Sequence, residues 1–117
     1  MENNECITDK KGIEEQKAHM RRGLLEFSVL LLLAKEKKYA TEIISELKDA
    51  DMIVVEGTLY PLLSRLRHEA LLTHTWEESI SGPPRKYYSL TEKGKDTLIS
   101  LKHTWSNLHK SITHLLQ

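Results

Sequence analysis

Apolar residues recur at helical spacing in two long segments, one near each end of the chain. The first series consists of Ile13, Met20, Leu24, Phe27, Leu31 and Ala34, and the last consists of Leu98, Leu101, Trp105, Leu108, Ile112 and Leu115. Spacings of three, four and seven residues are typical of helices that pack along one seam against another helix. We therefore predict a first helix from about residue 13 to 34. The last helix is predicted to follow Thr91 as its N-cap and to reach about Leu116.

Two shorter helices are predicted between these long ones. One fits residues 41–48, and the other fits residues 57–70, where Leu59, Leu62, Leu63 and Leu66 point one way. The β-branched segment 52–55 between them is either a short strand or an extended link. From Val29 to Leu33 the first helix is apolar on all sides, so this part is expected to be buried.

A β-hairpin is predicted between the third and last helices. Residues 71–78 and 85–90 contain good strand formers, and the segment 79–84, Ser-Ile-Ser-Gly-Pro-Pro, is rich in turn residues. The order helix, helix, helix, hairpin, helix predicts a mainly α winged helix-turn-helix fold with a small β-hairpin. The two long helices have more apolar surface than this fold requires, which predicts that they form a dimer.

This organisation divides the chain into three parts. Residues 1–12 are predicted to form a flexible arm, residues 13–91 a winged helix-turn-helix DNA-binding domain, and residues 92–117 a C-terminal dimerisation helix. All six apolar residues of the last series, from Leu98 to Leu115, are assigned to the dimer seam.

Composition narrows the class of protein. The 117 residues include 17 Lys and Arg against 17 Asp and Glu, so a uniformly basic nucleic-acid coat is excluded while a local basic surface is not. The single cysteine, Cys6, cannot form a disulfide within the chain, which favours a reducing, cytoplasmic location. The longest apolar run is Val29–Ala34, and the segment Met1–Lys11 is polar, so we expect neither a membrane partner nor a signal peptide.

Three motifs resemble one family of regulators. They are Arg22-Gly23-Leu24-Leu25, the stretch Gly57-Thr58-Leu59-Tyr60-Pro61-Leu62-Leu63 with Arg65-Leu66, and Arg85-Lys86-Tyr87-Tyr88-Ser89-Leu90-Thr91-Glu92-Lys93-Gly94. Over residues 21–117 the chain resembles the PadR family of bacterial transcriptional regulators. Its single C-terminal helix resembles the small subfamily that includes LmrR-type multidrug-sensing repressors. The family often has Tyr-Gly-Tyr where this chain has Tyr39-Ala40-Thr41, and commonly has glycine where this chain has Ala70.

The third helix is the candidate recognition helix for double-stranded DNA. Thr58 and Ser64 are expected to donate to phosphate or a base edge, and Arg65 to pair with phosphate or guanine. Tyr60 either reaches phosphate or packs against the second helix.

The hairpin is the second candidate for DNA contact. Arg85 and Lys86 follow a Gly-Pro-Pro tip, so they contact phosphate or enter the minor groove, unless they are merely solvated at a strand end. For Arg21 and Arg22, phosphate contact and a salt link to acids are equal alternatives.

Trp105 is an unusual residue for a helix seam because its N–H needs a partner. The resemblance implies that it faces its symmetry mate across a dimer pore, where the pair would stack on a planar aromatic small molecule. His109 and Lys102, about one turn away, would line the rim. The alternative is a core anchor between the last helix and the partner's first helix.

Catalytic and metal-binding patterns do not stand out. The last-helix histidines His103, His109 and His114 are six and five residues apart, which suits a shared metal poorly. There is no glycine-rich phosphate loop or nucleophile elbow, so we expect neither an enzyme nor a metal or other cofactor.

The favoured function is therefore a homodimeric repressor of the PadR type that binds a palindromic operator, with half-sites ~34 Å apart. Release by a small aromatic ligand at the dimer interface is expected from the resemblance. The alternative is a winged-helix protein-interaction module without sequence-specific DNA binding, which the balanced charge favours.

Overall fold

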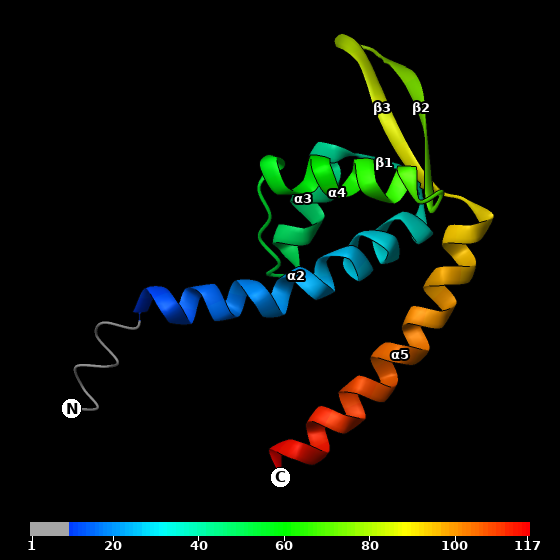
Figure 1. The fold of residues 1–117 in the computed structure, drawn as a ribbon. Helices are drawn as coiled ribbons and strands as arrows, with labels where there is room; N and C mark the ends of the chain where they lie inside the picture. Colours follow the sequence, from blue (N-terminus) through cyan, green and yellow to red (C-terminus); the bar gives the residue numbers. More distant parts are fainter. Residues whose placement is uncertain (1–9) are drawn as a thin grey trace.

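The computed structural model describes residues 10–117, and their arrangement is shown in Figure 1. The elements follow in the order α2 (Lys10–Lys35), β1 (Lys38–Tyr39), α3 (Ala40–Asp49), α4 (Glu56–His68), β2 (Leu72–Ser79), β3 (Gly82–Leu90) and α5 (Glu92–Leu116). The three strands form one antiparallel sheet in the order β1-β3-β2. The predicted winged helix-turn-helix plan is confirmed, with β1 as an additional strand.

The hydrophobic core lies where the second half of α2, α3, α4 and the base of the hairpin meet. The buried apolar side chains include Val29, Leu30 and Leu33 of α2, Ile43 and Leu47 of α3, Leu59, Leu63 and Leu66 of α4, and Leu72, Leu90 and Leu98. Burial of the Val29–Leu33 segment is confirmed, with Leu31 and Leu32 packed partly buried against the core. We call this unit, from Val29 to Leu98, the head.

The boundaries of several elements differ from the prediction. Helix α2 begins at Lys10, so residues 10–12 of the predicted arm are helical, and the rest of that arm lies outside the described residues. The 52–55 segment is an extended link rather than a strand, since none of its residues pairs with the described sheet. The hairpin turn consists of Ile80 and Ser81 alone, because β3 already begins at Gly82.

Pro83 and Pro84 therefore lie in a strand, although they were predicted in the turn. They occupy an irregular part of the ladder, between the pairs Glu77↔Arg85 and Ser79↔Gly82. A proline lacks the N–H that a regular ladder requires, so an interrupted stretch is where a strand tolerates it.

Strand β1 adds a buried cation to the head. Lys38 and Tyr39 pair with Tyr88 and Tyr87 of β3, and Lys38 is only 3% exposed. The Lys38 Nζ lies 2.9 Å from a carboxylate oxygen of Glu46, whose hydrogen bond is the main cause of a raised pKa for Lys38. A buried charge requires such a partner, so this ion pair fixes β1 to α3.

Thr91 joins the hairpin to α5. Its hydroxyl accepts from the Gly94 N–H at 3.0 Å, which confirms the predicted N-cap, and donates to the Ala70 carbonyl oxygen at 2.6 Å. Gly94 lies so close to Leu71 that an added Cβ would collide with the Leu71 carbonyl oxygen. Ala70, where the family commonly has glycine, adopts a left-handed conformation with φ 65°.

The two long helices approach each other beside the base of the hairpin, and their outer ends point away from the head (Figure 1). Leu98 is 4% exposed, which places it in the core of its own chain rather than on a face left for a partner. Leu101 packs against that core, whereas Leu108, Ile112 and Leu115 are exposed. Between residues 10 and 117, no helix has the length and apolar character needed to cross a membrane.

Candidate nucleic-acid interface

Helix α4 presents its polar side away from the core. Leu59, Leu63 and Leu66 are fully buried, whereas Ser64 and His68 on the opposite side are exposed. This is the orientation that the apolar spacing predicted. The exposed side of α4 is therefore free to enter a DNA groove, with Ser64 at its centre.

One flank of α4 faces α2. Arg65 lies on this flank, and its Nη2 is 3.0 Å from a carboxylate oxygen of Glu26 in α2. Its Nη1 is 3.3 Å from Glu69, one turn further along α4. The hydrogen bond and charge of Glu26 raise the pKa of Arg65. The guanidinium is thus held by two carboxylates, which compete with guanine or phosphate for its N–H donors.

The other flank of α4 faces the hairpin across a groove of about 430 Å³. The groove runs between the start of α3, α4 and the hairpin, and its lining includes Tyr39, Thr41, Tyr60, Trp76, Arg85 and Lys86. The structure thus brings together Tyr60, Arg85 and Lys86 from the predicted set. Thr58 and Arg65 lie on the opposite flank, away from them.

Tyr60 had two alternative roles, packing or phosphate contact. In the structure it is 48% exposed and lines the groove, so its ring is not buried against α3. A half-exposed phenol at a groove wall can donate its hydroxyl proton to an anion inside the groove.

Aromatic rings hold the two hairpin cations in place. The Arg85 guanidinium lies 4.5 Å from the centre of the Tyr39 ring, and its Nη1 donates to the Tyr39 hydroxyl oxygen at 3.2 Å. The Lys86 Nζ lies 5.8 Å from the Trp76 ring centre and 5.6 Å from that of Tyr88. Cation–π contacts position a charge without neutralising it. Within residues 10–117 neither Arg85 nor Lys86 forms an ion pair, so both charges remain available to an anion.

His74 lies beside the groove and is close to two cations. Its ring lies 6.3 Å from that of Tyr88, next to the groove. Desolvation by burial lowers the pKa of His74, and the nearby Lys86 and Arg67 cations lower it further. Two cations, Lys86 and Arg67, therefore lie near His74 although the net charge of the chain is zero.

The groove also contains residues that the sequence did not assign to DNA contact, among them Tyr39, Thr41 and Trp76. Tyr39 is the N-cap of α3, Thr41 lies in its first turn, and Trp76 is the direct cross-strand neighbour of Lys86. Trp76 is 64% exposed, which is unusual for a large aromatic residue. The signal available in the sequence was the strand alternation that places Trp76 on the same face as buried Leu72 and half-buried His74.

Trp105 contacts its own chain rather than standing alone on α5. Its ring lies 6.4 Å from that of Phe27 in α2 and 5.7 Å from that of His109, and 42% of the residue remains exposed. His109 and Lys102 are both exposed. Among residues 10–117, no three His, Cys, Asp or Glu side chains lie close enough to hold a metal ion.

Comparison with known proteins identifies this architecture. The family described as transcriptional regulator PadR-like matches residues 29–100. A PadR-like transcription factor from Bacteroides fragilis is 51% identical, covers 86% of this chain and 98% of its own, and superposes with a TM-score of 0.73. A PadR-like regulator from Bacillus cereus is 36% identical, with 85% and 97% coverage and a TM-score of 0.77. A PadR family regulator from Eggerthella lenta is 31% identical, with 93% and 92% coverage and a TM-score of 0.79.

Proposed function

The chain belongs to the PadR-like family of transcriptional regulators, and from this premise we propose that it is a homodimeric repressor that binds a palindromic operator in double-stranded DNA. Transcription regulation, not enzyme chemistry, is the role that this family implies. The observation that carries the proposal is the groove between α4 and the hairpin, where Arg85 and Lys86 lie beside exposed Tyr60 and have no acidic partner among residues 10–117. The proposed site of action is the cytoplasm.

Each element of the head has a proposed role on DNA. Ser64 and Thr58 read base edges or phosphate from α4, while Tyr60, Arg85 and Lys86 contact the backbone from either side of the groove. Arg65 also contacts phosphate or guanine, but the competing charge of Glu26 makes its contribution smaller than that of the hairpin cations. Residues 13–91 act as the DNA-binding domain.

Dimerisation is proposed to use α5, as part of residues 92–117. Trp105, Leu108, Ile112 and Leu115 continue the helical spacing of Leu98 and Leu101 but remain exposed. A seam of this kind is buried when a second copy packs against it. The two heads would then meet successive major grooves about 34 Å apart.

A ligand site at the dimer interface completes the proposal. The single C-terminal helix and the position of Trp105 support membership of the small LmrR-like subfamily. Trp105 would stack on a planar aromatic molecule, with His109 and Lys102 at the rim. Its contact with Phe27 would link such a ligand to α2 and thus to the spacing of the heads.

The deciding experiment is a salt titration of DNA binding. The Arg85→Ala/Lys86→Ala variant is compared with wild type by fluorescence anisotropy, on a duplex selected from a randomised pool and on an unrelated duplex. Loss of two phosphate contacts should weaken binding to both duplexes and reduce the salt slope by up to about two units. The matched control, Lys95→Ala/Lys110→Ala, removes two charges from α5 and should retain wild-type affinity.

Two results would count against the proposal. Wild-type protein that shows no salt-dependent binding to any duplex would favour the protein-interaction alternative. A hairpin variant that binds as tightly as the control variant at every salt concentration would remove Arg85 and Lys86 from the interface.

A further inference from the structure

The tip of the hairpin carries a fully exposed apolar side chain. Ile80 and Ser81 form the two-residue turn, and Ile80 has a relative exposure of 107%, above that of any other large apolar residue between residues 10 and 117. Single exposed apolar residues are common on protein surfaces, so exposure alone does not indicate a contact. Ile80 is distinguished by its place at the end of a hairpin that projects from the helices (Figure 1).

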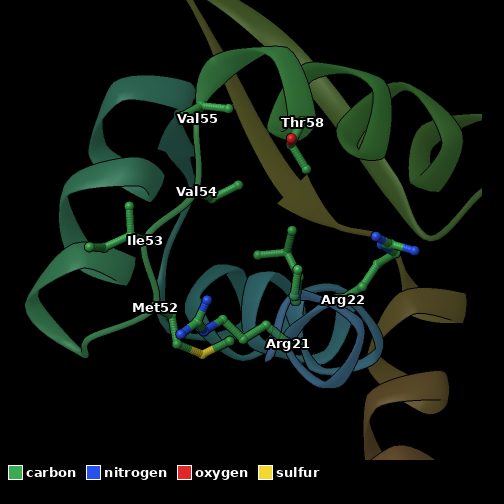
Figure 2. Close-up of a pocket in the computed structure, with 9 residues that line it drawn as sticks. Arg21, Arg22, Met52, Ile53, Val54, Val55 and Thr58 are labelled. Atoms are coloured by element: carbon green, nitrogen blue, oxygen red, sulfur yellow. The ribbon is translucent and has the colours of Figure 1, made fainter. Parts of the chain in front are cut away.

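Two other exposed apolar residues of the head have more of their own chain beside them. Ile53 and Val55 lie in the link between α3 and α4, and Figure 2 shows them bordering a cavity that two arginines of α2 also line. Ile80 instead lies beyond the last pair of the hairpin ladder. Its side chain is therefore placed to enter a partner rather than to cover part of its own chain.

The hairpin that presents Ile80 is restrained on both strands. Pro83 and Pro84 follow the turn, and the proline ring fixes φ at both positions. On the other strand, Glu77 forms an ion pair with Lys37, which lies between α2 and β1. A restrained tip loses little conformational freedom on binding, so insertion of its side chain costs less.

Charge is distributed along the hairpin as a DNA groove requires. Residues 79–84 carry no charge, whereas Arg85 and Lys86 directly behind them have no acidic partner among residues 10–117. This order matches a duplex, because phosphates line the edges of a groove and base edges form its floor. Glu78 is the acid next to the tip, and it borders the same hollow as Arg85, whose opposite charge offsets it.

The distance from the cations to the tip fits the minor groove. Arg85 is paired with Glu77, and Ile80 lies three residues beyond Glu77 along the chain. At ~3.3 Å per residue, the tip extends roughly 10 Å past Arg85. The minor groove is about 6 Å wide and about 7.5 Å deep, so a hairpin held at a phosphate by Arg85 reaches the base pairs.

We propose that Ile80 is an apolar wedge that enters the minor groove, inserts between two base pairs and kinks the duplex, a role that rests on the DNA-binding function proposed above. An inserted apolar side chain partly unstacks a base step, and the contacts of the bent duplex offset the lost stacking. Pyrimidine–purine steps such as TA and CA unstack most easily. Ile80 thus makes the protein sensitive to a step with which it forms no hydrogen bond.

The experiment measures distortion of the DNA separately from affinity. In the duplex selected from the randomised pool, 2-aminopurine replaces the adenine of each TA or CA step in turn, and its fluorescence rises when the base unstacks. Saturating wild-type protein should raise the signal at least about twofold at one step in each half-site. Ile80→Ala should lose this increase while its affinity falls no more than about tenfold. Because Ile80 covers no core residue, the variant should unfold at the same urea concentration as wild type.

A control variant and a second duplex isolate the wedge. Ile99→Ala truncates an isoleucine that is 57% exposed on the side of α5 opposite the proposed seam, and it should behave like wild type. When the responsive step is replaced by the stiffer AA, wild type should bind about tenfold more weakly, and Ile80→Ala less than about threefold.

The outcomes separate the wedge from DNA binding itself. An Ile80→Ala variant that still unstacks the step, or a wild-type protein that binds the duplex without unstacking any step, would overturn the wedge and leave the DNA-binding function standing. Wild-type protein that binds no duplex would overturn both.

Discussion

The head and the outer parts of the two long helices have the same pattern of apolar residues but opposite burial. Every buried apolar side chain among residues 10–117 lies between Val29 and Leu98. Further along α5, Leu108 and Ile112 continue the spacing of Leu98, yet each is more than half exposed. Met20 in the outer part of α2 is 76% exposed. Helical spacing therefore shows which face is apolar, but only the fold shows whether that face is covered within the chain.

The two regions also differ in what a substitution should disturb. In the head, close packing against backbone makes even one added carbon costly. In the outer helices, the same change meets open space, and it would affect only the free energy of the proposed association with a second copy.

Gly94→Ala should cause the largest loss of stability. The new Cβ would collide with the backbone carbonyl of Leu71, which cannot move without displacing the start of the hairpin. We expect a loss of about 3 kcal/mol in the free energy of unfolding, measured by urea denaturation at fixed protein concentration.

Gly23→Ala is the matched control in α2. An added Cβ at Gly23 meets no atom within 4 Å, and alanine is the better helix former, so stability should rise by up to about 1 kcal/mol. Equal effects of the two substitutions would mean that the Thr91–Gly94 junction is not as tightly packed as described.

Leu108→Glu/Ile112→Glu should abolish the dimer while the head stays folded. Two charges placed in an apolar seam have no partners there, so the dimer dissociation constant should rise about 100-fold or more. Sedimentation velocity measures the loss. Ser106→Glu/His114→Glu adds the same charge on the opposite side of α5 and should leave the dimer intact. A dimer that survives the seam variant would require a different interface.

The elements that the sequence predicted well are those whose signal is local. The signals for the helices, for the Thr91 N-cap and for the two hairpin strands each come from residues close together in the sequence. Strand β1 has no such signal, since Lys38 and Tyr39 become a strand only by pairing with Tyr88 and Tyr87 of β3, far along the chain. The same limit applies to Arg65, because its partner Glu26 is 39 residues distant.

The sequence indicated which residues to consider for the candidate interface, but not which of them lie together in space. Arg85 and Lys86 were found from charge and turn chemistry, but their stacking on Tyr39 and Trp76 depends on the register of the sheet. Leu98 shows the converse case. Its spacing predicted a place in the dimer seam, but Leu98 is buried in the core of its own chain and is not available to a partner.

Trp105 lies at the boundary between the two regions, and its replacement should separate a ligand role from a structural one. In a Trp76→Phe background, Trp105→Leu keeps the seam apolar but removes the stacking surface. Affinity for a planar fluorescent dye should fall about tenfold, as expected for a lost aromatic contact of 1–1.5 kcal/mol. If dye affinity is unchanged in an intact dimer, Trp105 is a packing residue against Phe27 and the interface ligand is refuted.

Ala70→Gly should give the smallest effect, and the only gain in the head. Ala70 has a φ of 65°, a left-handed conformation in which its Cβ is crowded, whereas glycine adopts it without that penalty. The Ala70 carbonyl still accepts from Thr91, so no hydrogen bond is lost. Relief of this crowding should raise the free energy of unfolding by about 1 kcal/mol. The greater freedom of glycine in the unfolded chain should cancel part of that gain. Ala50→Gly at the end of α3, where φ is −93°, is the control and should destabilise the head instead. If both substitutions destabilise equally, the strain assigned to the junction between α4 and the hairpin is absent.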